Sequence, residues 1–465
     1  MERLFSLLEA PLIWLSHQFS NFGNQSRRPS SPSECIGHSL ENATFGQPVN
    51  LPASDLERHT YVLGATGSGK TNLILGLLRQ DLARRHSVAV VDLRGDLVER
   101  ALALCADEGV ASERVVLLDL REPKWVVGFN PLRSGAEPFV RALHLLDVIR
   151  GESDSWGVQL EETMRSAFLL LAHADQAITD LESLLFDLDY LSDLVATCNE
   201  PSITQFFSRY AALSEEKQLA FALPVMNKVT PLLATPGLRA VLGSARTIDL
   251  DSVLNRRGTV LLVSLAVDEL HRSSRMLGAL IVSAISRVMC SRVTTPEAKR
   301  NPVRLYVDEF EAMASASFEG LIAEGRRFKL SLVLSHQNLA QLPPKLRSII
   351  RNNVGLQILG RCGFQDAEDL RRELPDNLTA EDLVSLQPGQ MLLMSRGEDA
   401  QLIRTELAVA QVGAAEAMEY RARVLREIGT PITEVTEKLQ AKRRAANRPH
   451  FDESGPWGLE DEPWS

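Results

Sequence analysis

The chain has 465 residues, enough for two or three structural units at roughly 150 residues per domain. Hydrophobic residues make up 45% and charged residues 24%, which excludes a wholly disordered, collagen-like or membrane-embedded molecule. Fifty Lys and Arg against sixty Asp and Glu give a formal charge of -10, so any contact with nucleic acid must be local. Five scattered cysteines without C-x-x-C spacing argue against a disulfide framework or a zinc site.

Residues 1–19 are apolar enough to suggest a membrane span, but charged residues and Pro11 interrupt the run. They also lack the cationic start and small-residue cleavage site of a signal peptide. The sequence therefore predicts no transmembrane helix here, but a short amphipathic helix that carries Leu4, Phe5, Leu8, Leu12 and Leu15. We expect it to dock on its own protein, with attachment to a partner or a membrane surface as the alternative. Residues 20–44 are predicted to be a flexible linker.

Short apolar runs alternate with helical patterns from His59 onward. The runs are apolar on both faces and are separated by helix-length segments, which predicts a mainly parallel sheet covered by helices. The predicted strands read TYVLG, SVAVVDL, RVVLLDL, GTVLLVSLAV, VRLYVDEF, LSLVLSH, VGLQILG and QMLLMS. We assign residues 45–137 and 247–412 to this α/β domain.

The alternation stops once, between residues 138 and 246. This stretch has apolar faces of period 3.6 and no convincing strand, which predicts an all-α insertion in the α/β domain. Residues 413–437 form another predicted helix. Residues 438–465, basic at first and then acidic, are predicted to be disordered because neither half buries enough apolar surface to offset the entropy lost on ordering.

The strongest motif follows the first predicted strand. Residues 64–71 read GATGSGKT and match G-x-x-x-x-G-K-[ST], with a helical run after them, as a phosphate-binding loop (P-loop) requires. Glycines let successive backbone N–H groups turn toward a phosphate at the positive end of the helix. Lys70 is then expected to reach the β- and γ-phosphates, and Thr71 to hold Mg²⁺ through its hydroxyl. No guanine-reading N-K-x-D segment is present, so we expect ATP, bound by Gly64, Ala65, Thr66, Gly67, Ser68, Gly69, Lys70, Thr71 and Asn72.

A carboxylate pair ends the predicted strand in VRLYVDEF, at the edge where open α/β sheets bind ligands. Asp308 is expected to hold the magnesium ion. Glu309 is expected to polarise the water that attacks the γ-phosphate. A solvated strand end is the alternative, and the accompanying P-loop makes it the less favoured one.

Two further candidates lie downstream. Gln337 directly follows LSLVLSH, where its amide can hydrogen-bond both the γ-phosphate and the attacking water. Arg326 and Arg327 end the preceding helix, where one guanidinium is placed to reach the γ-phosphate of a neighbouring subunit. The alternatives are a surface Gln that caps its strand, and arginines that complement a helix dipole. Spacing alone does not choose between the two arginines, and we expect His336 to be structural.

The order of these motifs resembles that of the conjugative coupling-protein ATPases of type IV secretion, within the superfamily of the FtsK and HerA DNA pumps. The resemblance covers roughly residues 45–410. The P-loop alone indicates only a nucleotide-hydrolysing protein, and the other motifs make the resemblance more specific. It rests on GATGSGKT, VAVVDLRGDL, FNPL, WGVQLEETMRSA, LYVDEFEAM, EGRRFKLSLVLSHQNLAQL and RNNVGLQILGRCGFQDAEDL.

The resemblance implies a RecA-like motor domain with an all-α domain inserted between the two Walker motifs, assembled as a homohexameric ring around DNA. It implies that Lys70 and Thr71 hold phosphate and Mg²⁺, that Asp308 and Glu309 form the Walker B pair, and that Gln337 is the sensor.

Arg326 matches the arginine finger of the family better than Arg327, because it is the first basic residue after Gly325. Asp92 and Asp96 match a stretch that we expect to be structural or to face the channel. Membrane-anchored members begin with transmembrane helices, whereas this sequence has only the interrupted segment 1–19. We therefore expect a cytoplasmic protein, with peripheral attachment to the inner membrane through a partner as the alternative.

The expected function is ATP-driven movement of DNA, or of a DNA–protein complex, through sequence-independent phosphate contacts on inward loops. A relaxosome, secretion-channel or other protein partner would be reached through the N-terminal helix or the acidic tail with Trp457 and Trp464. The alternative is a nucleotide-switched receptor or scaffold that recruits substrate with little turnover. The complete Asp308, Glu309 and Gln337 set favours a hydrolase, and the long chain with its insertion disfavours a small-molecule kinase.

Overall fold

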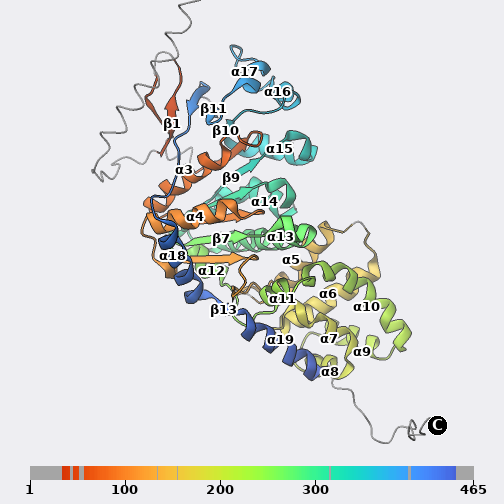
Figure 1. Cartoon of the computed structure of the whole chain (residues 1–465). Helices are drawn as coiled ribbons and strands as arrows, with labels where there is room; N and C mark the ends of the chain where they lie inside the picture. Colours follow the sequence, from red (N-terminus) through yellow and green to blue (C-terminus); the bar gives the residue numbers. More distant parts are fainter. Residues whose placement is uncertain are drawn as a thin grey trace, which may run out of the picture.

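The computed structural model describes residues 34–446, except 42–44, 52–56, 134, 154, 314–315 and 396–398. The predicted helix at 1–19 and residues 447–465 of the predicted tail lie outside the described residues. Within the described part, one large sheet with helices on both faces is joined to a block of helices (Figure 1). This confirms the predicted fold class, an α/β P-loop domain with a mainly parallel sheet and an all-α insertion.

The sheet is parallel over most of its width. The parallel strands, in spatial order, are β10 (Val354–Leu359), β3 (His59–Leu63), β9 (Leu330–His336), β8 (Val303–Asp308), β4 (Ser87–Asp92), β7 (Val260–Ser264) and β5 (Val115–Asp119). Beyond β10 the sheet continues antiparallel through β11 (Gln390–Ser395), β12 (Gln401–Arg404), β1 (Glu34–Ser39) and β2 (Pro48–Leu51). Every strand predicted from an apolar run is present.

Both faces of the parallel strands are buried, because alternate residues point to opposite sides of a sheet. In β4, Val88 and Val90 belong to the core on one face, whereas Ala89 and Val91 belong to the core on the other. The first core includes residues of α3 (Lys70–Ala83), α4 (Asp96–Asp107) and α18 (Ala414–Ile428). The second includes residues of α13 (Val267–Ser291), α14 (Ala316–Glu324) and α15 (Pro344–Asn353).

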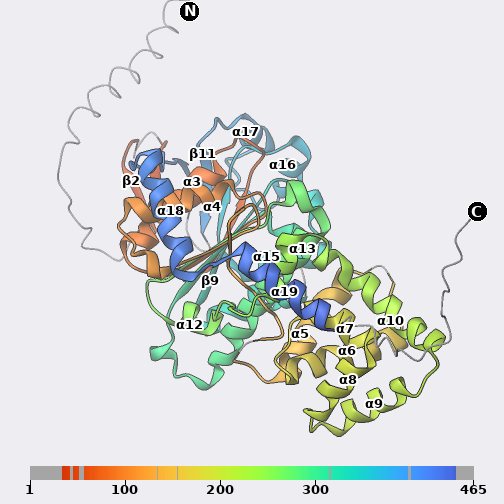
Figure 2. The same ribbon diagram turned by 60° about the horizontal axis from the view of Figure 1, so that its bottom comes forward.

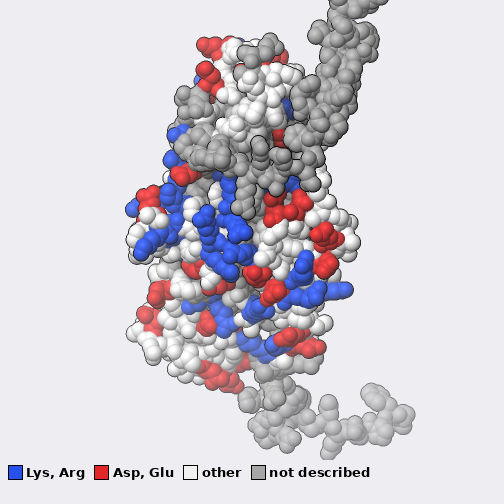
Figure 3. Space-filling view, turned by 90° about the vertical axis from the view of Figure 1, so that its left-hand side faces the viewer, with Lys and Arg blue, Asp and Glu red and all other residues white. Residues whose placement is uncertain are grey.

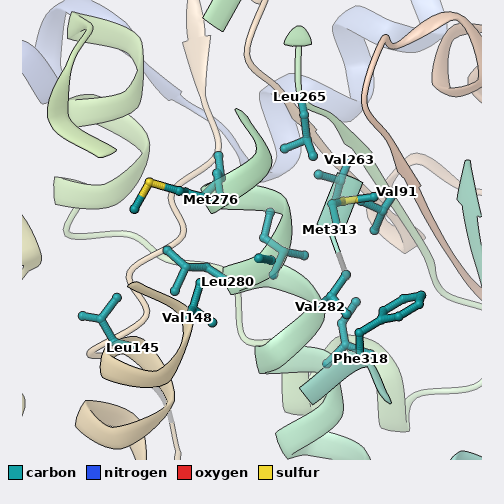
Figure 4. Close-up of a cluster of buried hydrophobic side chains, with 14 of the residues drawn as sticks. Val91, Leu145, Val148, Val263, Leu265, Met276, Leu280, Val282, Met313 and Phe318 are labelled. Atoms are coloured by element: carbon teal, nitrogen blue, oxygen red, sulfur yellow. The ribbon is translucent and has the colours of Figure 1, made fainter. Parts of the chain in front are cut away.

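The helix α13 is central to the second core. Figure 4 shows Leu280 of α13 toward Leu145 and Val148 of the helical insertion, and Met313 beside Val263 of the sheet. Residues Arg272–Thr294 are the one helix in the described part that is long and apolar enough to cross a membrane, and 72% of its most apolar window is buried inside the protein. Its apolar character is therefore accounted for by packing between the sheet and the insertion.

The helical insertion begins after β6 (Trp125–Val126). Its helices are α5 (Pro138–Gly151), α6 (Val158–His173), α7 (Leu181–Phe186), α8 (Leu188–Ala196), α9 (Pro201–Ala211), α10 (Glu215–Val229) and α11 (Pro236–Gly243). They form one hydrophobic core with the second face of the sheet. Outside the insertion lie the further helices α12 (Leu250–Asn255), α16 (Phe364–Leu370) and α17 (Ala380–Ser385). The short helical turns include η1 (Ser112–Arg114), η6 (Phe310–Met313) and η7 (Gly325–Phe328).

The prediction of a flexible linker at residues 20–44 is wrong for residues 34–39, which form β1 (Glu34–Ser39). Residues 34–39 pair with β12 and β2, and Ile36 is buried against the first core. The segment lacks a long apolar run because a strand in the antiparallel part of a sheet needs only one buried face, and the strands on both sides supply its hydrogen bonds.

The C-terminal boundaries are also corrected. The single helix predicted at 413–437 is two helices, because α18 ends at Ile428, and β13 (Thr430–Pro431) pairs with β6 before α19 (Ile432–Ala446) begins. Pro431 has no N–H to continue a helix. Residues 438–446 of the predicted disordered tail are helical, and Lys442 donates to Asp180 of the insertion at 2.8 Å. Figure 2 shows α18 beside the sheet domain and α19 beside the insertion.

Candidate nucleotide-binding site

The P-loop connects β3 to α3 at the carboxyl edge of the parallel strands. Gly67 and Gly69 have φ values of 75° and 103°, in the left-handed region that favours glycine. Gly69 is the N-cap of α3, so the loop curls directly over the positive end of a 14-residue helix. A Cβ on Gly64 would lie 2.6 Å from Ser68 Oγ, which explains why this position also needs glycine. Thr66 lies in the loop itself, and Thr71 is half-buried in the first turn of α3.

Lys70 is buried beneath the loop, with 8% of its surface exposed. Its ammonium donates to the carbonyls of Gly64 and Ala65, the latter at 3.3 Å. Burial lowers the pKa of Lys70, while the charges of Asp308 and Glu309 oppose this shift. The ammonium therefore lies close to the carboxylates at the end of β8.

Asp308 and Glu309 differ in their surroundings. Asp308 accepts a hydrogen bond from the Ser335 hydroxyl of β9, and burial raises its pKa although that bond opposes the shift. Glu309 follows the strand with a φ of 51°, an uncommon left-handed conformation for a side chain of this size. Its carboxylate lies 3.3 Å from Nε of Arg94.

Gln337 bridges the P-loop and the end of β8. Its amide nitrogen donates to Oε1 of Glu309 at 2.7 Å, and its amide oxygen accepts from Oγ1 of Thr66 at 2.8 Å. The sequence predicted Gln337 and Glu309 as separate candidates. Through Thr66 the structure brings both to the P-loop, on the side of the sheet where Lys70 lies.

Glu311 is a carboxylate of this site that the sequence interpretation did not select. It lies in η6, and its Oε2 is buried with no hydrogen-bond partner among the described residues. Burial raises its pKa to about 7, and the charges of Glu309 and Asp308 add to the shift. The D-E-x-E spacing of residues 308–311 was the signal in the sequence that could have indicated Glu311. The turn after the strand brings this third residue after Asp308 back toward the end of the strand.

Asn72 differs from its predicted role as a nucleotide ligand. Its side-chain nitrogen donates to the carbonyl of Glu406, and its oxygen accepts from the N–H of Ala408 at 2.8 Å. The segment after β12 is thereby fastened to α3. The loop before β11 also contacts the P-loop, because Gly389 donates to the carbonyl of Ser68 at 2.9 Å.

Arg326 lies at the opposite edge of the sheet. It is exposed in η7, which precedes β9. The pKa of His59 is lowered to about 4, mainly by burial and in addition by the positive charge of Arg326. His59 starts β3, which runs for five residues before the P-loop, or about 17 Å at 3.3 Å per residue. Arg326 is therefore not brought to the P-loop of its own chain. Arg327 differs from it, because its guanidinium lies 5.8 Å from the centroid of the Phe328 ring.

Asp92 holds the start of a helix, which agrees with the structural role that was one of its two expected roles. Its carboxylate accepts from the N–H groups of Leu97 and Val98, at 2.8 and 3.2 Å, and so holds the start of α4. Burial raises the pKa of Asp92, against these backbone hydrogen bonds. Asp96 is exposed at the first position of α4.

The donor set at the loop suits Mg²⁺. No cluster of three or more His, Cys, Asp or Glu side chains suited to a metal occurs in the described part of the chain. Mg²⁺ does not need such a cluster, because it is usually held by one or two protein oxygens together with phosphates and water. Thr71 and Asp308 provide oxygen donors of this kind.

The fold has solved counterparts. The bacterial conjugative coupling protein TrwBΔN70 matches with a TM-score of 0.60 and 16% identity, covering 82% of this chain and 90% of that one. The plasmid coupling protein TrwB in complex with ADP and Mg²⁺ gives the same values. VirB4 of Thermoanaerobacter pseudethanolicus matches with a TM-score of 0.55 and 14% identity, covering 84% of this chain and 98% of that one. No curated protein sequence matches the chain.

The sequence model of the type IV secretion-system coupling protein DNA-binding domain matches residues 46–348. That range contains the P-loop, the helical insertion, the carboxylates after β8 and Gln337. The chain belongs to the type IV secretion-system coupling protein family.

Proposed function

We propose that this protein hydrolyses ATP with Mg²⁺ and uses the reaction to move DNA, or a DNA–protein complex, through a ring of identical subunits. The observation that carries the proposal is the bridge of Gln337 between Thr66 and Glu309. It joins the P-loop to the strand ends, so that a triphosphate on the loop lies next to a carboxylate base. The known complexes of TrwB with ADP and Mg²⁺ and with an ATP analogue support this choice of ligands.

Each residue has a defined task in this proposal. Backbone N–H groups of the P-loop and the start of α3 bind the β-phosphate, while Lys70 turns from the loop carbonyls to the γ-phosphate. Thr71 and Asp308 hold Mg²⁺, which supplies charge neutralisation when bound. Glu309 accepts a proton from the attacking water, and Gln337 orients that water and senses the γ-phosphate.

DNA is the proposed cargo because the matched family is described as the coupling protein DNA-binding domain. The formal charge of -10 makes bulk attraction to DNA unfavourable, so the contacts are local and directed at phosphates without reading sequence. We place the protein in the cytoplasm, where DNA and ATP are both present, with protein partners linking it to a secretion channel.

The arginine finger requires a second subunit. Arg326 is separated from the P-loop of its own chain by about the length of the five-residue strand β3. A neighbouring copy that presents Arg326 to the γ-phosphate makes hydrolysis depend on assembly, as in other finger-dependent P-loop proteins.

The test is ATP turnover by the full chain with and without duplex DNA, combined with displacement of a third strand from a DNA triplex. A motor shows DNA-stimulated turnover and ATP-dependent displacement. Tight ATP binding with negligible turnover in every oligomeric state would instead identify a nucleotide-switched receptor. The Lys70→Ala variant is the matched control, because it removes the phosphate contact and should abolish both signals.

A further inference from the structure

The two edges of the parallel sheet carry opposite charge. In the described part of the chain, the segment before every parallel strand contains Lys or Arg, on the edge opposite the P-loop. Figure 3 shows the side of the molecule where α3, α4 and α18 lie, with basic side chains gathered over its middle. We call six of these residues the basic belt: Arg85 before β4, Arg114 before β5, Arg256 and Arg257 before β7, Lys299 before β8 and Arg327 before β9.

The charges of the basic belt are not neutralised within the subunit. None of its six members forms an ion pair with a described carboxylate, and all but the half-buried Arg114 are exposed. Three of them meet around Gly258, whose Cβ position is 3.0 Å from Nη1 of Arg114 and 3.5 Å from Cβ of Arg85. Nη1 of Arg114 also donates to the carbonyl of Arg257 at 2.8 Å. Such a concentration of unpaired cations, in a protein of formal charge -10, calls for an anionic partner.

The carboxyl edge of the same sheet carries a group of acidic side chains. Asp308 and Glu309 end β8, and the exposed Asp96 and Asp268 stand at the starts of α4 and α13. Arg94 and Arg121 of the same edge pair with Glu309 and Asp268 at 3.3 and 3.6 Å, so part of this acidic charge is neutralised within the subunit. A head-to-tail contact between two copies joins the basic surface of one copy to the acidic surface of the other. The pair still has one free basic surface and one free acidic surface, so further copies can add until a ring or a filament forms. Such a contact also carries Arg326, which shares the edge of the belt, toward the nucleotide site of the next copy.

We propose that the basic belt is the surface with which one subunit docks on the acidic carboxyl edge of the next. This inference rests on the ring of the proposed function and adds to it the two surfaces that meet. The belt attracts and orients the neighbouring subunit, and Arg326 is delivered to the triphosphate as a result. Because Asp96, Asp268 and most of the belt are exposed before they meet, their attraction is screened by salt, with a Debye length of about 10 Å at 0.1 M and about 3 Å at 1 M.

The test uses the full chain with Mg²⁺ and a non-hydrolysable ATP analogue, analysed by sedimentation velocity. The belt variant is Arg256→Glu with Arg257→Glu, and the edge variant is Asp96→Lys with Asp268→Lys. The control is Arg209→Glu with Lys217→Glu on the exposed surface of the helical insertion, which changes the net charge as much as the belt variant does. Thermal melting checks that each variant remains folded.

We expect wild type and control to form species larger than a dimer at about 0.1 M salt and to dissociate toward monomers as salt rises. The belt variant and the edge variant should each remain monomeric. Their equimolar mixture should assemble beyond a dimer again. The wild-type belt of the edge variant meets the wild-type edge of the belt variant, and the two reversed surfaces, an acidic belt and a basic edge, are also of opposite charge.

Three results would overturn the inference. They are assembly of the belt variant at wild-type concentrations, failure of the two variants to co-assemble when mixed, and failure of wild type to assemble at any concentration. Assembly that persists in the belt variant while duplex-DNA binding is lost would assign the belt to DNA instead. Binding of a fluorescent ATP analogue by the monomers tests the proposed function separately, since neither variant removes a residue of the P-loop.

Discussion

At the level of single residues, the conformation of Glu309 sets the geometry of the site. A left-handed φ of 51° is disfavoured for this residue type, at a cost of roughly 1–2 kcal/mol. The turn η6 begins at the next residue, so the chain reverses directly after Asp308. The carboxylate of Glu309 is thereby turned toward Gln337, and the next acidic residue, Glu311, returns to the same site. The strained backbone at Glu309 thus accompanies the placement of the Glu309 and Glu311 carboxylates near the ammonium of Lys70.

The first prediction concerns the base. Glu309→Gln keeps the size of the side chain and its contact with Gln337 but removes the proton acceptor. We expect ATP hydrolysis to fall by about 10²–10⁴-fold, the usual contribution of a positioned base, while nucleotide affinity changes little. Single-turnover hydrolysis and titration with a fluorescent ATP analogue measure the two quantities separately. A fully active variant would remove Glu309 from the mechanism.

The second prediction concerns Glu311, whose pKa is raised from 4.5 to about 7, mainly by burial. A carboxyl group with a raised pKa in the folded state favours folding in its protonated form, so the native state loses stability as pH rises from 4.5 to 7. Glu311→Gln keeps the side chain neutral. We therefore expect a higher melting temperature than wild type at pH 8 and no difference near pH 4.5, measured without nucleotide. A constant difference across this range would show that ionisation of Glu311 is not involved.

At the level of helices and strands, the sequence predicted what depends on local pattern. The parallel strands are apolar on both faces, so each stood out as a continuous run bounded by helical periodicity. The strands β1, β2 and β12 did not, because they lie at the antiparallel end of the sheet and include half-buried or exposed residues, with a single buried residue in each of β2 and β12. The pairing of β1 with β12 joins opposite ends of the chain, and no local pattern reports such a pairing.

The same reasoning separates the predicted from the unpredicted parts of the site. The P-loop, Asp308 and Gln337 were selected because each stands directly after an apolar strand. Ser335 and Arg94 were missed, although they contact Asp308 and Glu309, because only the strand order shows which neighbours they face. The use of the Asn72 amide to hold a segment 334 residues away was equally invisible in the sequence.

The third prediction concerns the attachment of α3 to the sheet. Asp81 of α3 is fully buried, lies 3.1 Å from Nη1 of Arg304 and accepts a hydrogen bond from the Tyr306 hydroxyl, both in β8. Although burial raises the pKa of Asp81, the charge of Arg304 and these hydrogen bonds bring it below its ordinary value. Asp81→Asn removes the negative charge from this buried ion pair, and breaking such a pair by removing one partner costs about 3–5 kcal/mol.

Urea-induced unfolding measures this loss. The double variant Asp81→Asn with Arg304→Met removes both charges, so it should be more stable than the single variant. Equal stability of the two variants would mean that the ion pair does not fasten α3 to β8.

At the level of the whole molecule, the C-terminal helices tie the two structural parts together. Arg421 of α18 forms ion pairs with Asp119, the last residue of β5, and with Glu122 just after it, at 2.8 and 3.0 Å. Arg246, where the insertion returns to the sheet, donates to the carbonyl of Glu427 at 2.8 Å, and Lys442 of α19 pairs with Asp180. A movement of the insertion relative to the sheet must therefore be accommodated by α18 and α19.

The fourth prediction tests whether a complete site needs two subunits. Arg326→Ala and Lys70→Ala should each be nearly inactive alone, the first for lack of a finger and the second for lack of a phosphate contact. In a mixture, a site is complete where an Arg326→Ala subunit supplies Lys70 and a Lys70→Ala subunit supplies Arg326. Random assembly of an equimolar mixture makes about one site in four complete. DNA-stimulated ATP turnover should thus reappear and pass through a maximum near equal proportions. A finger acting within its own chain gives no recovery at any ratio, which the position of Arg326 at the edge opposite Lys70 argues against.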